Sequence, residues 1–255
     1  IKFYFFLKNT IKKPTKQIYQ NYTSEDFNVW KTLFNRQLKI LKGIVADEFL
    51  FGLKDLGFSS NRIPNFLDIN KILKNYTGWS IKTVSNISPP REFFSCLAKK
   101  KFTTTCWLRS MSQVDYLEEP DMFHDVFAHV PLLSNEDYTS FFKEIGQIAV
   151  EVINDPLKLT MLQRLYWFTI EFGLIVSGDT YKIYGAGIIS SKEESKNVFS
   201  KKSKKLSFNV KKIMNHSFRT DVIQDTYYVI DSFEQLTRSV DEIRKQLKIV
   251  KSVDS

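Results

Sequence analysis

Apolar residues recur at helical spacing over much of the chain and predict a mainly α-helical protein. Residues 23–26, Thr-Ser-Glu-Asp, offer a helix start. Apolar residues follow this start at intervals of three and four, which predicts a buried helix face: Phe27, Trp30, Leu33, Phe34, Leu38, Leu41, Ile44 and Val45. Helical patterns also cover residues 64–76, 137–153, 157–176 and 232–247.

Shorter runs rich in β-branched and aromatic residues predict strands at 81–84, 101–108, 181–184 and 222–230. Residues 185–187, Gly-Ala-Gly, predict a turn. We find no internal repeat. The predicted fold class is therefore mainly α, of the α+β type, with packed helices and a few short strands in one domain.

Two of the three histidines, His124 and His129, stand five residues apart. Five residues along an α-helix rotate by about 500°, so the two side chains would point about 140° apart. Pro131 disfavours helical geometry at Val130. We therefore expect the helix that starts near Pro120 to end at about His129, with His129 turning back from the last turn. This spacing differs from the His-Glu-x-x-His pattern of zinc enzymes.

Glu171 lies in an apolar run with no other charged residue within five positions on either side. A buried, unpaired carboxylate is costly, so it normally neutralises, pairs with a cation or binds a metal. A salt bridge to Arg164 is the alternative interpretation. Two histidines and one carboxylate can cover one face of an octahedral ion and leave the opposite positions open, as in non-haem Fe(II) enzymes. We therefore predict a metal site at His124, His129 and Glu171.

Length and composition fit one large domain: the chain has 255 residues, of which 43% are hydrophobic. The net charge is +9, and seven lysines lie between positions 196 and 212. Serine and asparagine separate these lysines, and no zinc-finger, RNA-binding or phosphate-loop motif accompanies them. We interpret the run as a solvated surface segment and expect no nucleic-acid partner.

Two cysteines, Cys96 and Cys106, are too few for a disulfide framework, so we expect free thiols and a cytoplasmic location. The opening residues 1–7 are apolar but far too short to span a bilayer, and we expect no membrane partner. The first residue is not methionine, which leaves an upstream segment open.

Three longer motifs occur in order at residues 115–133, 166–174 and 184–191, and they contain both histidines and Glu171. Together they resemble the pterin-dependent aromatic amino acid hydroxylases, most closely the bacterial single-domain phenylalanine 4-monooxygenases. The resemblance implies one catalytic domain over residues 1–255. Its iron- and pterin-binding core would span about 60–240, after an N-terminal helical segment of about 1–59.

The resemblance also implies a chemistry. His124, His129 and Glu171 would hold Fe(II), a tetrahydropterin would supply two electrons, and O2 would be the co-substrate. One oxygen atom enters the aromatic ring and the other leaves on the pterin. Phe93 stands where the family stacks an aromatic ring on the pterin, and Asp125 stands at an acidic pterin contact.

For the amino acid substrate, the resemblance assigns Arg109 to the carboxylate, which a guanidinium grips with two parallel hydrogen bonds. Trp167 would form an apolar wall of the pocket and Ser190 a polar contact. Tyr116 would be an accessory residue near the iron. The resemblance further implies that Trp167 would favour phenylalanine or tyrosine over tryptophan as the substrate.

The sequence departs from the family pattern at several positions. Ala128 stands where the family usually has glycine, Ser95 and Cys96 replace a glycine pair common in animal relatives, and Thr103 replaces a pocket histidine found there. We expect these changes to affect rate and substrate preference more than metal binding.

The leading prediction is phenylalanine 4-monooxygenase activity, with a role in phenylalanine catabolism. The alternative is a tyrosine or tryptophan hydroxylase of the same family. A zinc-dependent hydrolase at the same triad is less favoured, because no general base is placed like the glutamate of the zinc helix pattern. A further alternative is a binding module that keeps the fold but lacks catalytic activity, and Ala128 is the only residue that supports it. Because the regulatory domain and assembly helix of animal members are absent, we expect a monomer or a weak dimer.

Overall fold

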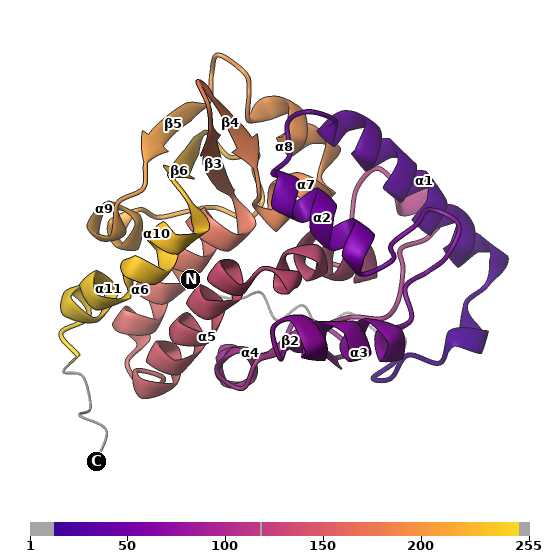
Figure 1. Ribbon diagram of the computed structural model, residues 1–255, viewed down its shortest axis with the longest axis horizontal. Coiled ribbons are helices and arrows are strands. Elements are labelled where there is room, and N and C mark those ends of the chain that lie inside the picture. The colour runs from indigo at the N-terminus through magenta and orange to yellow at the C-terminus, as the bar shows by residue number, and fades with distance from the viewer. Residues whose placement is uncertain (1–12, 118, 250–255) are drawn as a thin grey trace.

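Helices surround two small sheets in the computed structural model, which describes residues 13–117 and 119–249 (Figure 1). The opening apolar run, residues 1–7, lies outside this range. The α-helices are α1 (Ser24–Leu41), α2 (Asp47–Asp55), α3 (Phe66–Tyr76), α4 (Pro90–Ala98), α5 (Glu136–Glu151), α6 (Pro156–Tyr166), α7 (Ala186–Ser190), α8 (Lys192–Asn197), α9 (Val210–Asn215), α10 (Phe233–Arg238) and α11 (Val240–Gln246). The strands are β1 (Ser80–Thr83), β2 (Lys101–Thr104), β3 (Gly173–Ser177), β4 (Thr180–Ile183), β5 (Lys204–Ser207) and β6 (Thr226–Ile230).

Five short segments have other helical geometries. Those of 3-10 type are η1 (Tyr19–Asn21), η2 (Met111–Gln113) and η4 (Val130–Ser134), and those of π type are η3 (Phe123–His129) and η5 (Trp167–Glu171). The prediction of a mainly helical fold with a few short strands is confirmed.

The predicted start of α1 is confirmed by a capping box. The Thr23 hydroxyl accepts from the backbone N–H of Asp26, and the Asp26 carboxylate accepts from the backbone N–H of Thr23. The helix ends at Leu41 rather than at Val45, and Gly43 just after it takes a φ of +79°. The prediction for residues 64–76 is also confirmed, because α3 spans most of that range.

The larger sheet has the strand order β4-β3-β6-β5. Strands β3 and β4 pair antiparallel, whereas β6 pairs parallel with both β3 and β5. The smaller sheet is the parallel pair of β1 and β2, in which Ile81 lies opposite Phe102. The predicted strands at 101–108 and 222–230 are shorter than expected, because only residues 101–104 and 226–230 pair with neighbours.

The prediction of one helix over residues 157–176 is wrong at its C-terminal end. The chain leaves the helix after Glu171, and Gly173–Ser177 forms β3. A continuous apolar run does not distinguish a buried helix from a buried strand, and its β-branched residues pair here with β4 and β6. Residues 185–187 are not only a turn, since α7 begins at Ala186.

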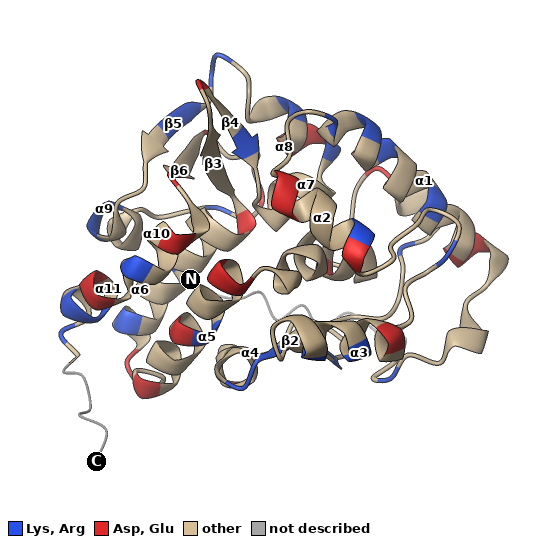
Figure 2. Cartoon of the chain, viewed as in Figure 1, with Lys and Arg blue, Asp and Glu red and all other residues tan. Residues whose placement is uncertain are grey.

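Among the described residues, five α-helices lie outside the predicted helical ranges: α2, α4, α7, α8 and α9. Helix α2 is short, and α4 begins with Pro90 at its first position, where the missing N–H of proline costs nothing. The lysine run at 196–212 contains β5 and α9 rather than only irregular structure. Six of its seven lysines are exposed, as expected, and Lys205 is half-buried. Both signs of charge are spread over α1, α2, α5 and α11 (Figure 2).

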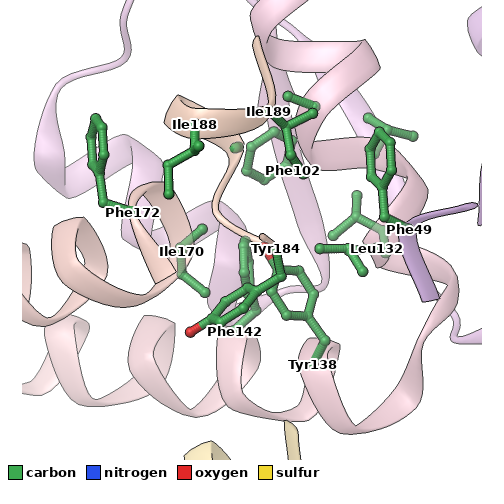
Figure 3. Close-up of a cluster of buried hydrophobic side chains, with 14 of the residues drawn as sticks. Phe49, Phe102, Leu132, Tyr138, Phe142, Ile170, Phe172, Tyr184, Ile188 and Ile189 are labelled. Atoms are coloured by element: carbon green, nitrogen blue, oxygen red, sulfur yellow. The ribbon is translucent and has the colours of Figure 1, made fainter. Parts of the chain in front are cut away.

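One cluster of buried apolar side chains extends from α1 to α11. The rings of Trp30, Phe34 and Phe49, from α1 and α2, contact Phe127 of η3 at centroid distances of 5.3–6.4 Å. A second group, which includes Tyr138, Phe142 and Tyr184, lies between α5 and the segment before α7 (Figure 3). The segments of the predicted metal site are therefore packed into the core.

Both cysteines are buried free thiols, as expected. Among the described helices, none combines the length and the apolar character needed to cross a bilayer.

Candidate metal and substrate site

The two histidines approach each other because they lie on a π-helix. In this geometry the hydrogen bonds run between residues five apart, so such residues lie one turn above each other. His124 and His129 both belong to η3. Segment η3 ends at His129, as expected, but Pro131 causes no break: Val130 keeps helical geometry, with a φ of −65° and a ψ of −35°, and the chain continues directly into η4. The wider turn, not a helix end, brings the imidazoles together.

Glu171 completes the predicted triad. Its carboxylate oxygens lie 3.2 Å from Nε2 of His129 and 3.6 Å from Nε2 of His124. The two Nε2 atoms lie 3.3 Å apart, and the three possible ligand atoms are all within 4.8 Å of one another. The salt bridge to Arg164 does not form, because that guanidinium donates to the backbone carbonyl of Met214. Two imidazole nitrogens and one carboxylate at this spacing fit an Fe(II) ion.

A second π-helix, η5, carries Glu171 at its end. The third sequence motif, residues 184–191, packs directly on the backbone of η5. A Cβ atom added to Gly185 would lie 2.5 Å from the Glu171 carbonyl oxygen, and one added to Gly187 would lie 2.7 Å from the Phe172 ring. Glycine at these two positions thus allows the start of α7 to contact the segment that holds the carboxylate.

The electrostatics of the triad favour metal binding. Burial lowers the pKa of His124 to about 4, so its imidazole is neutral near pH 7. Burial acts to raise the pKa of Glu171, but His129, His124 and the Tyr166 phenol more than offset it, so this pKa lies below its ordinary value. The site thus presents a neutral His124 imidazole and an ionised Glu171 carboxylate, which are the forms that bind a metal.

Ser190, which was expected to contact the substrate, lies against the candidate metal ligand His124. Its Oγ is 2.8 Å from Nδ1 of His124 and donates to the carbonyl of Ala186 at 2.9 Å. Because Ser190 donates its hydroxyl proton to the Ala186 carbonyl, its Oγ atom accepts a hydrogen bond from Nδ1–H of His124. Nε2 of His124 is then left with its lone pair free for a metal.

Arg109 is held by Asp121, which is fully buried. The Nε and Nη2 atoms of Arg109 donate to the two Asp121 oxygens at 2.9 and 2.8 Å. Asp121 also accepts from the backbone N–H groups of Arg109, at 3.0 Å, and His124, at 3.3 Å. One carboxylate therefore fixes the direction of the guanidinium and the start of the histidine-bearing π-helix.

The two residues expected at the pterin come from different helices, Phe93 from α4 and Asp125 from η3. Asp125 accepts from the backbone N–H and the hydroxyl of Thr105, at 2.7 and 2.8 Å. Burial raises the pKa of Asp125 to about 7, although both hydrogen bonds favour the carboxylate. The Phe93 ring is only partly buried and meets Tyr166 edge-on at 5.3 Å. Phe93 therefore keeps some surface open to a ligand.

Trp167 begins η5, four residues before Glu171, and its ring stacks on Phe218 at 4.4 Å. Tyr116 is different, because 77% of its surface is exposed. Among the described residues, none makes a hydrogen bond, ion pair or ring contact with Tyr116. The structure thus brings Trp167, but not Tyr116, into the packed surroundings of the triad.

Of the departures from the family pattern, Ala128 is fully buried in η3, Cys96 is buried in α4, and Thr103 is buried in β2. The third histidine, His216, matches none of the family motifs; it stacks on Phe168 at 4.6 Å and lies 3.0 Å from the Tyr228 hydroxyl. His216 is thus a packing residue.

Sequence reasoning missed several residues that support the site, among them Asp121, Thr105, Tyr166 and Gln224. Asp121 and Tyr166 lie inside the motifs that carried the family resemblance, so their position was a usable signal. Thr105 is an ordinary strand residue in the sequence, and only the fold brings it to Asp125.

Comparisons with known proteins agree with this arrangement. Residues 7–254 match the sequence pattern of the family described as biopterin-dependent aromatic amino acid hydroxylases. The phenylalanine-4-hydroxylase of Ralstonia nicotianae is 44% identical over 228 residues, which cover 89% of this chain and 71% of that protein. That of Chromobacterium violaceum is 45% identical over 216 residues, which cover 84% of this chain and 72% of that protein.

Solved structures of the Chromobacterium violaceum phenylalanine hydroxylase have the same fold. The structure with bound oxidised Fe(III) has a TM-score of 0.86 at 42% identity and covers 93% of this chain and 87% of that chain. The structure with iron(III) and 7,8-dihydrobiopterin has a TM-score of 0.85 at 42% identity, with coverage of 93% and 86%. The chain belongs to the biopterin-dependent aromatic amino acid hydroxylases.

Proposed function

We propose that this protein is a phenylalanine 4-monooxygenase, which converts L-phenylalanine to L-tyrosine with Fe(II), a tetrahydropterin and O2. The observation that carries the proposal is the convergence of His124, His129 and Glu171 on one point, with donor atoms within 4.8 Å of one another. The similarity to phenylalanine-4-hydroxylases over most of the chain supports the choice of reaction.

His124, His129 and Glu171 would hold the iron and leave one side of it open. Iron and pterin, when bound, supply the activation of O2 and the two electrons that ring hydroxylation needs. Ser190 would keep Nε2 of His124 ready for the metal by accepting the proton of Nδ1. The protein otherwise contributes orientation and the exclusion of water, which its buried surroundings favour.

For the substrate, Arg109 would bind the amino acid carboxylate. Two of its five N–H groups donate to Asp121, which leaves donors on the far edge of the guanidinium for a second carboxylate. Trp167 would form the apolar wall beside the ring. Phe93 and Asp125 would contact the pterin, one by stacking and one by hydrogen bonding.

The alternatives within the family are tyrosine and tryptophan hydroxylation. Because a pocket wall discriminates modestly between apolar rings, the three amino acids need direct comparison. We further propose a cytoplasmic location, which the two free thiols support, a monomer or weak dimer, and a role in phenylalanine breakdown. Size-exclusion chromatography with light scattering tests the assembly state.

The test is aerobic turnover of phenylalanine by Fe(II)-loaded protein with a tetrahydropterin, with tyrosine quantified. Controls omit iron or pterin, and parallel reactions offer tyrosine or tryptophan. Tyrosine that forms only with both additions supports the proposal. Iron-loaded, folded protein that hydroxylates none of the three amino acids contradicts it, and faster turnover of tryptophan than of phenylalanine contradicts the choice of substrate.

A further inference from the structure

The indole ring of Trp167 is held by a hydrogen bond at its edge as well as by contacts with two other rings. Its Nε1–H donates to the side-chain oxygen of Gln224 at 3.1 Å. Phe218 stacks on the ring at 4.4 Å with an interplanar angle of 11°, and Phe172 lies at 4.6 Å with an angle of 36°. Ring contacts alone allow the indole to slide in its plane, whereas a hydrogen bond at the edge fixes its rotation.

Gln224 has its amide orientation fixed. Its Nε2 group donates to the backbone carbonyls of Arg219 and Val222, both at 2.9 Å. A reversed amide would place two N–H donors against the indole N–H and an oxygen against two carbonyls. Because Gln224 is 7% exposed, water would not relieve these mismatches. Gln224 therefore presents an acceptor, and not a donor, to Trp167.

The backbone of Gln224 is anchored in turn by α8. The Glu194 carboxylate accepts from the backbone N–H of Gln224 at 2.8 Å and from the Tyr227 hydroxyl at 2.6 Å. Asn197 donates to the backbone carbonyl of Gln224 at 2.7 Å. Glu194 is itself 7% exposed, so this anchor is enclosed. The Gln224 side chain thus extends toward Trp167 from a fixed backbone.

We propose that Gln224 is a positioning residue for amino acid selection, which acts by holding the Trp167 indole ring in one orientation beside the substrate. This inference rests on the proposed function, because it requires Trp167 to line the amino acid pocket. The side-chain hydrogen bonds of Gln224 all go to protein groups, so it would act through Trp167. Its loss should therefore weaken phenylalanine binding and selectivity while the chemical step is largely kept.

The test is a double-mutant cycle of Gln224→Met and Trp167→Phe. Methionine keeps the length of the glutamine side chain but lacks the amide acceptor, and phenylalanine keeps a ring but lacks the indole N–H. In the wild-type background, we expect Gln224→Met to raise the KM for phenylalanine about fivefold to tenfold. This is the size of effect expected when one buried hydrogen bond is lost. The preference for phenylalanine over tryptophan should fall by a similar factor, with kcat changed less than threefold. In the Trp167→Phe background, Gln224→Met should change these values less than twofold.

A spectroscopic measurement tests the contact itself. The protein has four tryptophans, and the indole N–H signal missing from the ¹⁵N NMR spectrum of Trp167→Phe identifies Trp167. In Gln224→Met that signal should move upfield, as expected for a lost hydrogen bond. Asp221→Asn is the matched control, because Asp221 lies in the same loop with its side chain exposed. It should change neither the signal nor the KM.

The outcomes are separable. If the wild-type protein forms tyrosine but Gln224→Met has equal effects in both backgrounds, the inference is wrong and the proposed function stands. An unmoved indole signal would also overturn the inference. If the wild-type protein forms no tyrosine, the proposed function fails and the inference fails with it. Should Gln224→Met not fold, Gln224→Asn replaces it in the cycle, because asparagine keeps the amide but is too short to reach the indole.

Discussion

Nδ1 of His124 lies 2.8 Å from Oγ of Ser190, and that hydroxyl donates its own proton to Ala186. The second contact decides the direction of the first, since Ser190 can then only accept from His124. The tautomer of a proposed metal ligand is thus set by α7, an element more than 60 residues away along the chain. The contact links the third sequence motif to the first.

Ser190→Ala should weaken Fe(II) binding by about 10-fold to 100-fold, because the histidine loses the partner that orients it. Binding to the apoprotein can be measured by calorimetry with Fe(II) under anaerobic conditions or with Co(II). Ser191→Ala is the control. Ser191 accepts from the backbone N–H of Glu194 at the start of α8, so its loss should lower stability without changing metal affinity. Equal metal affinities of Ser190→Ala and the wild type would contradict the prediction.

His124→Ala should abolish stoichiometric iron binding and tyrosine formation while the protein remains folded. The side chain is partly exposed and contributes to the site more than to the core. Iron content after gel filtration and far-UV circular dichroism measure the two effects. His216→Ala is the matched control: it removes a ring stacked on Phe168 and should reduce stability but leave the iron in place. Full iron content in His124→Ala would show that the ligand assignment is wrong.

Arg109→Lys should raise the KM for phenylalanine by at least about 10-fold, because lysine cannot bind Asp121 with two parallel hydrogen bonds while it offers donors to a second carboxylate. Steady-state kinetics with varied phenylalanine give the value. Arg62→Lys changes an exposed arginine paired with Asp68 and should leave the KM unchanged. A KM increase of similar size in both variants would point to a non-specific effect.

Gly185→Ala should lower both stability and iron affinity. The added methyl group would lie 2.5 Å from the Glu171 carbonyl oxygen and from the backbone nitrogen of Gly173, and backbone atoms cannot easily move away. Overpacking of this kind costs about 1–3 kcal/mol. Gly178→Ala provides the comparison, because Gly178 has a φ of +59° but no atoms near its added methyl group. That variant should lose stability by backbone strain and keep its iron affinity, so an equal loss of affinity in both would contradict the prediction.

The pH dependence of apoprotein stability should reveal Asp125. Burial raises its pKa from 3.8 to about 7. Between these values the native protein holds a proton that the unfolded chain has lost, so the stabilisation is complete below pH 3.8 and is lost as the pH rises through 7. Asp125→Asn cannot ionise and still accepts from Thr105. Its stability relative to the wild type should therefore be higher at pH 8 than at pH 5.

The measurement is the urea midpoint of metal-free wild type and Asp125→Asn at both pH values. Asp115→Asn is the control, because the Asp115 side chain is 73% exposed. Its difference from the wild type should vary little between pH 5 and pH 8. The same constancy in Asp125→Asn would contradict the pKa shift.

Sequence pattern was most informative where local chemistry decides structure. The capping box at Thr23 determines the start of α1, and Gly78 follows the end of α3. Both act within a few residues of the helix end, so both ends could be predicted. Strand β3 could not be predicted in the same way. Its residues form a strand because β4 and β6 pair with them, and β6 lies about 50 residues further along the chain.

For the site, residue types were enough to predict that His124, His129 and Glu171 would lie together, but not how. Phe123 and Phe127 of the π-helix η3 pack against rings of α1 and α2, and no spacing rule contains such contacts between distant segments. Support from Gln224 was missed for a similar reason, because its side chain reaches Trp167 from 57 residues further along the chain.

The π-helix of η3 also has a consequence for chain length. A π turn holds one residue more than the α-helical turn it replaces, so deleting one residue between the histidines would give a spacing of four. An ordinary α-helix presents residues four apart on one face. Two histidines on one helix can thus face the same metal in two ways: four residues apart on an α-helix or five residues apart on a π-helix. Changing one spacing into the other requires the deletion or insertion of one residue. Substitution alone cannot convert one into the other.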